Sequence, residues 1–167
     1  MSDLLTTVAD KLKEKFGTAF ISAEMDYDFP VFTLEKSVLY ETLSFLKSEP
    51  DMNFNFLTTM AGIHYPDMKE KEFCITYQLH NLFLNHRIRL KFYMPESDMK
   101  VPSITHIWPT ANWMERQEYD FFGFNFIGHP DLRRILNMDE MNYFPLRKQY
   151  PLEDGSRDDK NDKLFGR

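Results

Sequence analysis

Two consecutive runs of alternating apolar and polar residues constrain the fold of this 167-residue chain more than any other feature. Nearly every second residue is apolar over residues 73–79 and again over 88–94, which is the period of a strand with one buried face. Residues 81–85 join the runs, so the economical interpretation is an antiparallel β-hairpin. Its apolar face is expected to pack against helices, leaving on the other face a basic stripe made of Arg87, Arg89 and Lys91.

Two segments before the hairpin have the apolar spacing of amphipathic helices. The first is expected to end at Gly17, because glycine favours the conformation of a helix stop. The second is expected to begin near Glu35. A strand is predicted over residues 53–60, with Phe54 and Phe56 on one face.

A short third helix is predicted after the hairpin. Asn112 and Glu115 have the spacing of a capping box, and Gly123 provides a stop. Arg116 and Asp120 are one helical turn apart, which is the spacing of an ion pair on a helix surface.

Glu115 and Glu118 lie on neighbouring positions of this helix, so an acid–base pair is one interpretation of them. Carboxylate chemistry of the glycosidase kind needs two carboxyl groups facing each other across a substrate, which adjacent turns of one helix do not provide. We therefore favour capping plus a salt bridge with Arg116.

Regular periodicity ends after the third helix, and three prolines keep the following segment extended or turning. The chain is therefore expected to divide into an α+β core domain, residues 1–123, which includes the short capped helix, and an extended arm, residues 124–167. The arm is predicted to bind a partner and to end in a flexible, polar tail over residues 153–167.

Composition excludes several classes of function. The formal net charge of −6 argues against a general nucleic-acid binder. Cys74 is the only cysteine, so the chain alone can form no internal disulfide, no iron–sulfur cluster and no thiolate zinc site. The five histidines show no metal-ligand spacing. The sequence has no apolar run long enough to span a bilayer and no targeting segment, so a soluble protein of a bacterial cytoplasm is expected.

The arm carries the densest set of basic side chains. Arg133 and Arg134 lie between apolar residues, and Arg147 and Lys148 follow a proline. Arginine is enriched at the centres of protein interfaces, which favours a docking surface. Aromatic residues are interleaved with these basic residues, so a groove that binds single-stranded nucleic acid is the alternative interpretation of this segment. His129 lies in a Gly-His-Pro turn and is expected to bond the backbone.

Six short strings stand out in the second half of the chain: Glu115-Arg116, Tyr119-Asp120, Gly123, Gly128-His129-Pro130, Leu132-Arg133-Arg134-Ile135-Leu136 and Pro145-Leu146-Arg147-Lys148. Taken together, they resemble the signature of the C-type, or thirty-kilodalton, subunit family of respiratory complex I, the proton-pumping NADH:quinone oxidoreductase. The resemblance covers most of the chain and is strongest over residues 73–152. The chain departs from the usual pattern at Gln117, Gln149 and His64.

The resemblance implies an α+β fold, with helices packed on a mixed β-sheet and an extended C-terminal arm. It implies a structural subunit of the peripheral arm that docks on the large D-type subunit, near the quinone-side cluster subunit. Such a protein would be a subunit of the enzyme, but it would have no catalytic site, cofactor or small-molecule ligand of its own. FMN and iron–sulfur clusters would lie in other subunits. The chain would be held at the cytoplasmic face of a bacterial inner membrane, and only through the assembled complex.

The residues expected to contact partner subunits are Glu115, Arg116, Asp120, His129, Arg133, Arg134, Arg147 and Lys148. Arg133, Arg134, Arg147 and Lys148 are expected to pair with carboxylates of the large D-type subunit. Some of the arginines are expected to be under-satisfied within the chain alone. Two alternatives stay open: the equivalent subunit of a membrane-bound hydrogenase or formate hydrogenlyase, and a single-stranded nucleic-acid-binding module with no role in respiration.

Overall fold

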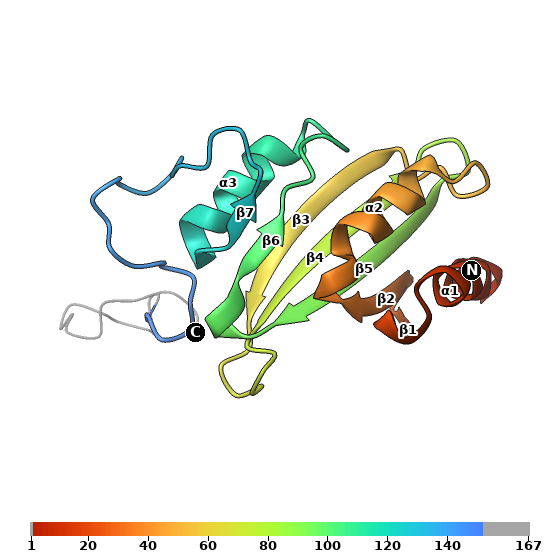
Figure 1. Cartoon of the computed structure of the whole chain (residues 1–167), viewed down its shortest axis with the longest axis horizontal. Helices are drawn as coiled ribbons and strands as arrows, with labels where there is room; N and C mark the ends of the chain where they lie inside the picture. Colours follow the sequence, from red (N-terminus) through yellow and green to blue (C-terminus); the bar gives the residue numbers. More distant parts are fainter. Residues whose placement is uncertain (1, 152–167) are drawn as a thin grey trace, which may run out of the picture.

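The structure is a computed structural model that describes residues 2–151 of the chain, without the side chains of Ser2 and Asp3. Figure 1 shows a twisted sheet with α2 across its front, α1 beside β1 and β2, and α3 beyond the opposite edge. The elements in chain order are α1 (Ser2–Phe16), β1 (Phe20–Asp26), β2 (Phe29–Glu35), α2 (Leu39–Ser48), β3 (Phe56–His64), β4 (Phe73–Asn81), β5 (His86–Met94), β6 (Lys100–Pro102), α3 (Ala111–Phe122) and β7 (Asn125–Ile127).

The main sheet has five strands in the order β1-β2-β5-β4-β3. Only β2 and β5 run parallel, and the other neighbours are antiparallel, so the sheet is mixed as expected. The small parallel pair of β6 and β7 forms a second sheet. The predicted α+β class, with helices on a mixed sheet, is confirmed.

The hairpin is confirmed as β4 and β5, which pair from Phe73 opposite Met94 to Asn81 opposite His86. Its apolar side chains are completely buried and form the centre of one hydrophobic core with α1 and α2. The basic stripe faces acids on β1. Arg89 contacts Asp26 at 2.8 Å, and Lys91 lies 3.8 Å from Glu24.

Two strand and helix boundaries differ from expectation. The predicted strand over residues 53–60 begins instead at Phe56 and continues to His64. Phe54 precedes it and is buried, whereas Phe56 is exposed, so the prediction that they share a face is wrong. A short 3-10 turn, Lys36–Val38, delays the start of α2 to Leu39.

The capping box predicted for α3 is wrong. The helix begins at Ala111, two residues earlier than a cap at Asn112 implies, and its N-cap Thr110 makes no side-chain capping bond. Asn112 therefore lies inside the first turn. The predicted stop is confirmed, because Gly123 closes the helix with a φ of 87°, in the left-handed region that glycine adopts at low cost.

The edge of the sheet at β3 is covered by α3. Gly62 on β3 donates its N–H to the carboxylate of Glu118 at 2.5 Å. A β-carbon at position 62 would lie 2.5 Å from the Phe124 ring and 2.9 Å from the Phe122 ring, so the close approach depends on glycine. This contact gives one edge N–H of β3 a partner and limits pairing with another chain there.

The division into domains at residue 123 stays a prediction. Phe124 and Phe126, just beyond it, belong to the same core as the sheet. The predicted polar tail over residues 153–167 lies outside the described residues.

Candidate functional site

The arm, described here over residues 124–151, folds back along α3 (Figure 1). Arg116 of α3 is the first attachment point. Its guanidinium donates to the carbonyl oxygens of Arg133 at 3.2 Å and Arg134 at 3.3 Å, and it lies 4.9 Å from the centre of the Trp113 ring. The predicted surface pair with Asp120 is therefore wrong, since Arg116 bonds the arm backbone.

Asp120 is the second attachment point, and it is completely buried. Its Oδ2 accepts the backbone N–H groups of Ile135, Leu136 and Asn137 at 3.1, 2.8 and 3.0 Å. Its Oδ1 accepts Arg134 at 2.8 Å. Burial opposes ionisation, but the N–H groups and the guanidinium outweigh it and hold the pKa of Asp120 far below its ordinary value.

Arg134 bonds other residues of the arm as well as α3. Beyond the Asp120 carboxylate, it donates to the carbonyl oxygens of Asp120, Met141 and Tyr143 at 2.9 to 3.0 Å. Its side chain is only 8% exposed. Four contacts on one guanidinium shape the loop between residues 134 and 143.

Arg147 forms the third attachment point. It donates to the carbonyl oxygen of Phe122 at 2.8 Å and to Glu96 at 2.9 Å. Its guanidinium lies about 5 Å from the ring centres of both Phe73 and Phe144. Phe144 in turn packs on Gly123, where a β-carbon would approach its ring to 2.6 Å.

The remaining candidates lie at the surface or in a turn. The side chain of Arg133 is 69% exposed and pairs with Asp131, and that of Lys148 is exposed. His129 accepts the N–H of Asp131 at Nδ1, so Nε2 carries the proton and donates to the carbonyl of Asn112 at 3.1 Å. The predicted backbone role of this turn histidine is confirmed.

The structure thus corrects the expectation that some of these arginines are under-satisfied within the chain, because Arg133 pairs with Asp131. Arg116, Arg134 and Arg147 are all engaged by this chain's own groups. Arg133 and Lys148 remain as the basic candidates whose side chains extend into solvent. Sequence reasoning missed three exposed apolar side chains of the arm. Ile127, Leu136 and Met138 are each more than half exposed. Their place beside prolines and charges in the arm was the available signal.

Glu115 and Glu118 are not the capping and surface groups expected from sequence, because both are buried. Glu115 accepts the N–H of Ile104 at 2.7 Å, and Glu118 accepts that of Gly62. Burial raises the pKa of each carboxyl to about 7, although these N–H groups favour the ionised form. Each glutamate joins α3 to a neighbouring backbone segment.

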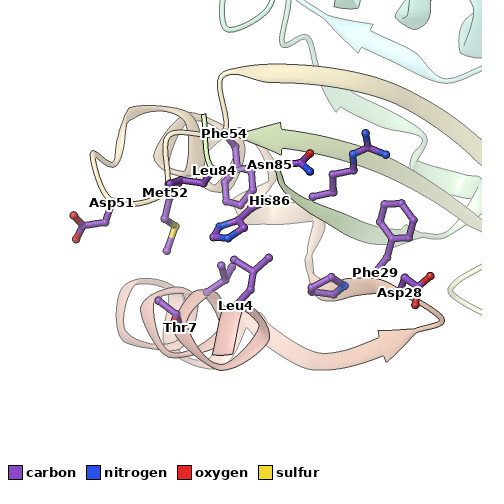
Figure 2. A pocket seen from close by; sticks show the side chains of 13 residues that line it. Leu4, Thr7, Asp28, Phe29, Asp51, Met52, Phe54, Leu84, Asn85 and His86 are labelled. Atoms are coloured by element: carbon purple, nitrogen blue, oxygen red, sulfur yellow. The ribbon is translucent and has the colours of Figure 1, made fainter. Parts of the chain in front are cut away.

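A cavity of about 710 Å³ lies away from the arm, between α1 and the β4–β5 loop (Figure 2). Its walls are mainly apolar, and Asp28 and Asp51 lie at its opposite ends. Asp51 is paired with Lys11 at 3.0 Å. This cavity collects none of the candidate residues.

Among residues 2–151, no group of three or more His, Cys, Asp and Glu side chains is arranged to hold a metal ion. Within the same range, no helix has the length and apolar character needed to cross a bilayer.

Comparison with known proteins matches residues 32–156 to the family described as respiratory-chain NADH dehydrogenase, 30 Kd subunit. The chain belongs to this family. The C subunit of the NADH-quinone oxidoreductase of Chlorobium phaeobacteroides is 35% identical over 147 residues, with 87% of each chain covered. The C subunit of Geobacter sulfurreducens is 34% identical, with 89% of this chain and 90% of the relative covered. Membership of the family makes this chain a part of the complex I assembly.

A third relative is longer. The C/D subunit of the NADH-quinone oxidoreductase of Acinetobacter baylyi is 38% identical over 149 residues, which are 86% of this chain and 25% of that protein. Among solved structures, the trypsin-resistant fragment (1-134) of Nqo5 is 31% identical with a TM-score of 0.66, covering 77% of this chain and 98% of the fragment. A chain of an archaeal membrane-bound sulfane sulfur reductase has a TM-score of 0.70 over 88% of this chain and 85% of its own, but at 22% identity it supports the fold alone.

Proposed function

We propose that this chain is a non-catalytic structural subunit of the peripheral arm of proton-translocating NADH:quinone oxidoreductase and that it docks on the large D-type subunit. Its contribution to electron transfer from NADH to quinone is made only through the complex. In this proposal FMN, the iron–sulfur clusters and quinone are bound by other subunits, including the neighbouring quinone-side cluster subunit. The complex holds the chain at the cytoplasmic face of a bacterial inner membrane.

The observation that carries the proposal is that the arm pairs its own buried polar groups and exposes apolar side chains. Arg116, Asp120 and Arg134 pair its buried polar groups within the chain, so these groups need no partner protein to satisfy them. The same segment exposes the apolar side chains of Leu136 and Met138, and in this proposal they form the contact surface for the partner. Preorganisation lowers the entropic cost of binding.

The partner is inferred from the relatives. The C/D subunit of Acinetobacter baylyi contains a region similar to this chain. Its name indicates that the C-type and D-type subunits share one polypeptide there. Segments fused in one relative commonly contact each other when they are separate chains. We therefore assign the exposed side of the arm to the large D-type subunit, with Arg133 and Lys148 meeting its carboxylates at the rim.

The nucleic-acid alternative is weakened, because Arg89 and Lys91 of the basic stripe are matched by acids on β1, and Arg134 and Arg147 of the arm are paired with this chain's own carboxylates. The hydrogenase-type alternative differs in the parent complex and not in this subunit. The names of the relatives favour NADH-quinone oxidoreductase.

The test is purification of the tagged full chain from native membranes and identification of the chains that accompany it. The double variant Leu136→Asp, Met138→Asp is expected to lose the large D-type subunit, because it places charge in an apolar contact. Tyr27→Asp is the matched control, since Tyr27 is 96% exposed in the β1–β2 turn, and it is expected to retain that partner. Full co-purification with the double variant would contradict the proposal. Variants of Arg134 are unsuitable, because they disrupt the arm itself.

A further inference from the structure

The C-terminal end of the arm is held to the sheet by a histidine. The backbone N–H of Lys148 donates to Nδ1 of His64 at 2.9 Å, across 84 positions of sequence. Because Nδ1 accepts this bond, the proton of the neutral ring is on Nε2. His64 is 6% exposed, and its ring is stacked on Phe73 with centroids 4.4 Å apart and planes 4° apart. The ring is therefore fixed in the orientation that accepts the bond.

The same phenyl ring also receives the arm. Arg147 lies 5.1 Å from the centre of Phe73 and is paired with Glu96 at 2.9 Å. Consequently His64 from β3 and Arg147 from the arm are both seated on Phe73. A positive charge on His64 would stand beside the cations of Arg147 and Lys148.

We propose that His64 is a pH-sensitive latch: its neutral imidazole holds the Arg147–Lys148 end of the arm on the sheet, and its protonation releases that end. A protonated imidazole carries N–H on both nitrogens and has no lone pair to accept with. The N–H of Lys148 would then face another N–H, so the two segments must separate. The inference concerns contacts within this chain and holds whatever the arm binds.

Within residues 2–151, four charged groups face His64, and they act in opposite directions. Glu72, just before β4, and Glu96 favour its protonation, whereas Arg147 and Lys148 of the arm oppose it. Burial is the largest influence and lowers the pKa of His64 below its ordinary 6.5. The folded chain therefore binds this proton less readily than the unfolded chain. The latch is therefore closed at the ordinary pKa of histidine and above, and it opens as the pH falls through the lowered pKa of His64.

The experiment measures hydrogen exchange at the Lys148 amide of the full chain between pH 8 and pH 5, with each rate divided by its intrinsic rate at that pH. Protection in the natural chain is expected to fall by about five-fold or more on acidification, the factor associated with losing one net hydrogen bond. His64→Asn places a carbonyl oxygen near the position of Nδ1 and does not titrate. Lys148 should stay protected in that variant at both pH values.

His64→Phe supplies the complementary variant, because it keeps a ring to stack on Phe73 and cannot accept the bond. Lys148 should be unprotected in it at both pH values, while amides of the β4–β5 hairpin stay protected and report an intact fold. Protection of Lys148 that does not change with pH in the natural chain would overturn the latch. So would a protected Lys148 in His64→Phe. If that variant unfolds, His64→Asn decides alone: a pH dependence equal to that of the natural chain overturns the proposal.

Discussion

The carboxylate of Asp120 lies 2.8 Å from the guanidinium of Arg134, in the arm, and not against Arg116 on its own helix. Arg134 is a partner 14 positions along the chain, with a side chain 8% exposed, and Asp120 has no exposed side-chain surface. This buried pair, with three backbone N–H groups on the same carboxylate, joins α3 to the arm. Breaking it by removing one partner leaves an uncompensated charge inside the protein.

Asp120→Asn is therefore expected to lower the free energy of unfolding by about 3 kcal/mol and to expose amides of residues 135–137 to exchange. Urea denaturation and hydrogen exchange measure the two effects. Asp131→Asn is the control, because its pair with Arg133 is more than half exposed on both sides, and it should change stability by less than about 0.5 kcal/mol. Equal effects of the two variants would refute the assigned role of Asp120.

Glu118 gives a stability that depends on pH. Its pKa is about 7 in the folded chain, above the ordinary 4.5, because the carboxyl is buried. Between these values the folded chain holds a proton that the unfolded chain has lost, so the stability falls as pH rises from about 4.5 to 7. Glu118→Gln should raise the free energy of unfolding at pH 8 by about 1 to 3 kcal/mol and change it little at pH 4.5. Denaturation at both pH values tests this, with exposed Glu140→Gln as control. No gain at pH 8 would count against the buried charge.

Gly62→Ala is expected to destabilise the chain by about 3 kcal/mol, because the new methyl group would overlap Phe124, Glu118 and Phe122. Gly128→Ala separates this overlap from backbone strain. Gly128 has a φ of 84° with nothing within 4 Å of a β-carbon, so its variant should cost about 1 to 2 kcal/mol. Thermal unfolding of both variants gives the comparison, and a harmless Gly62→Ala would disprove the close packing of α3 on β3.

Tyr77→Phe tests a buried hydroxyl. The Tyr77 hydroxyl is buried without a hydrogen-bond partner among the described residues. Removing an unsatisfied buried group of this kind is expected to leave stability unchanged or to raise it by about 1 kcal/mol. Thermal unfolding supplies the measurement. A loss of stability would show instead that the hydroxyl is bonded, and Tyr93→Phe, at a half-buried site on β5, is a reference for tyrosine removal.

Local patterns predicted the features that depend on local geometry. The hairpin of β4 and β5 and the glycine stop of α3 appear where alternation and residue type placed them. The capping box and the Arg116–Asp120 pair failed for a common reason. Each rests on spacing within one helix, whereas segments distant in the sequence offer those side chains better partners than the helix does.

Sequence by itself determined the mixed α+β layout and, through the short strings between Glu115 and Lys148, the family to which the chain belongs. Tertiary structure decided what each charged residue does. Arg133 and Arg134 are adjacent and identical in type, yet one is 69% exposed and the other 8%. Alternation and helix stops are encoded within a few residues, whereas the partner of a charge depends on which distant segments the fold brings together. For this reason only the folded chain shows which groups hold the arm to α3 and which of its apolar side chains are exposed.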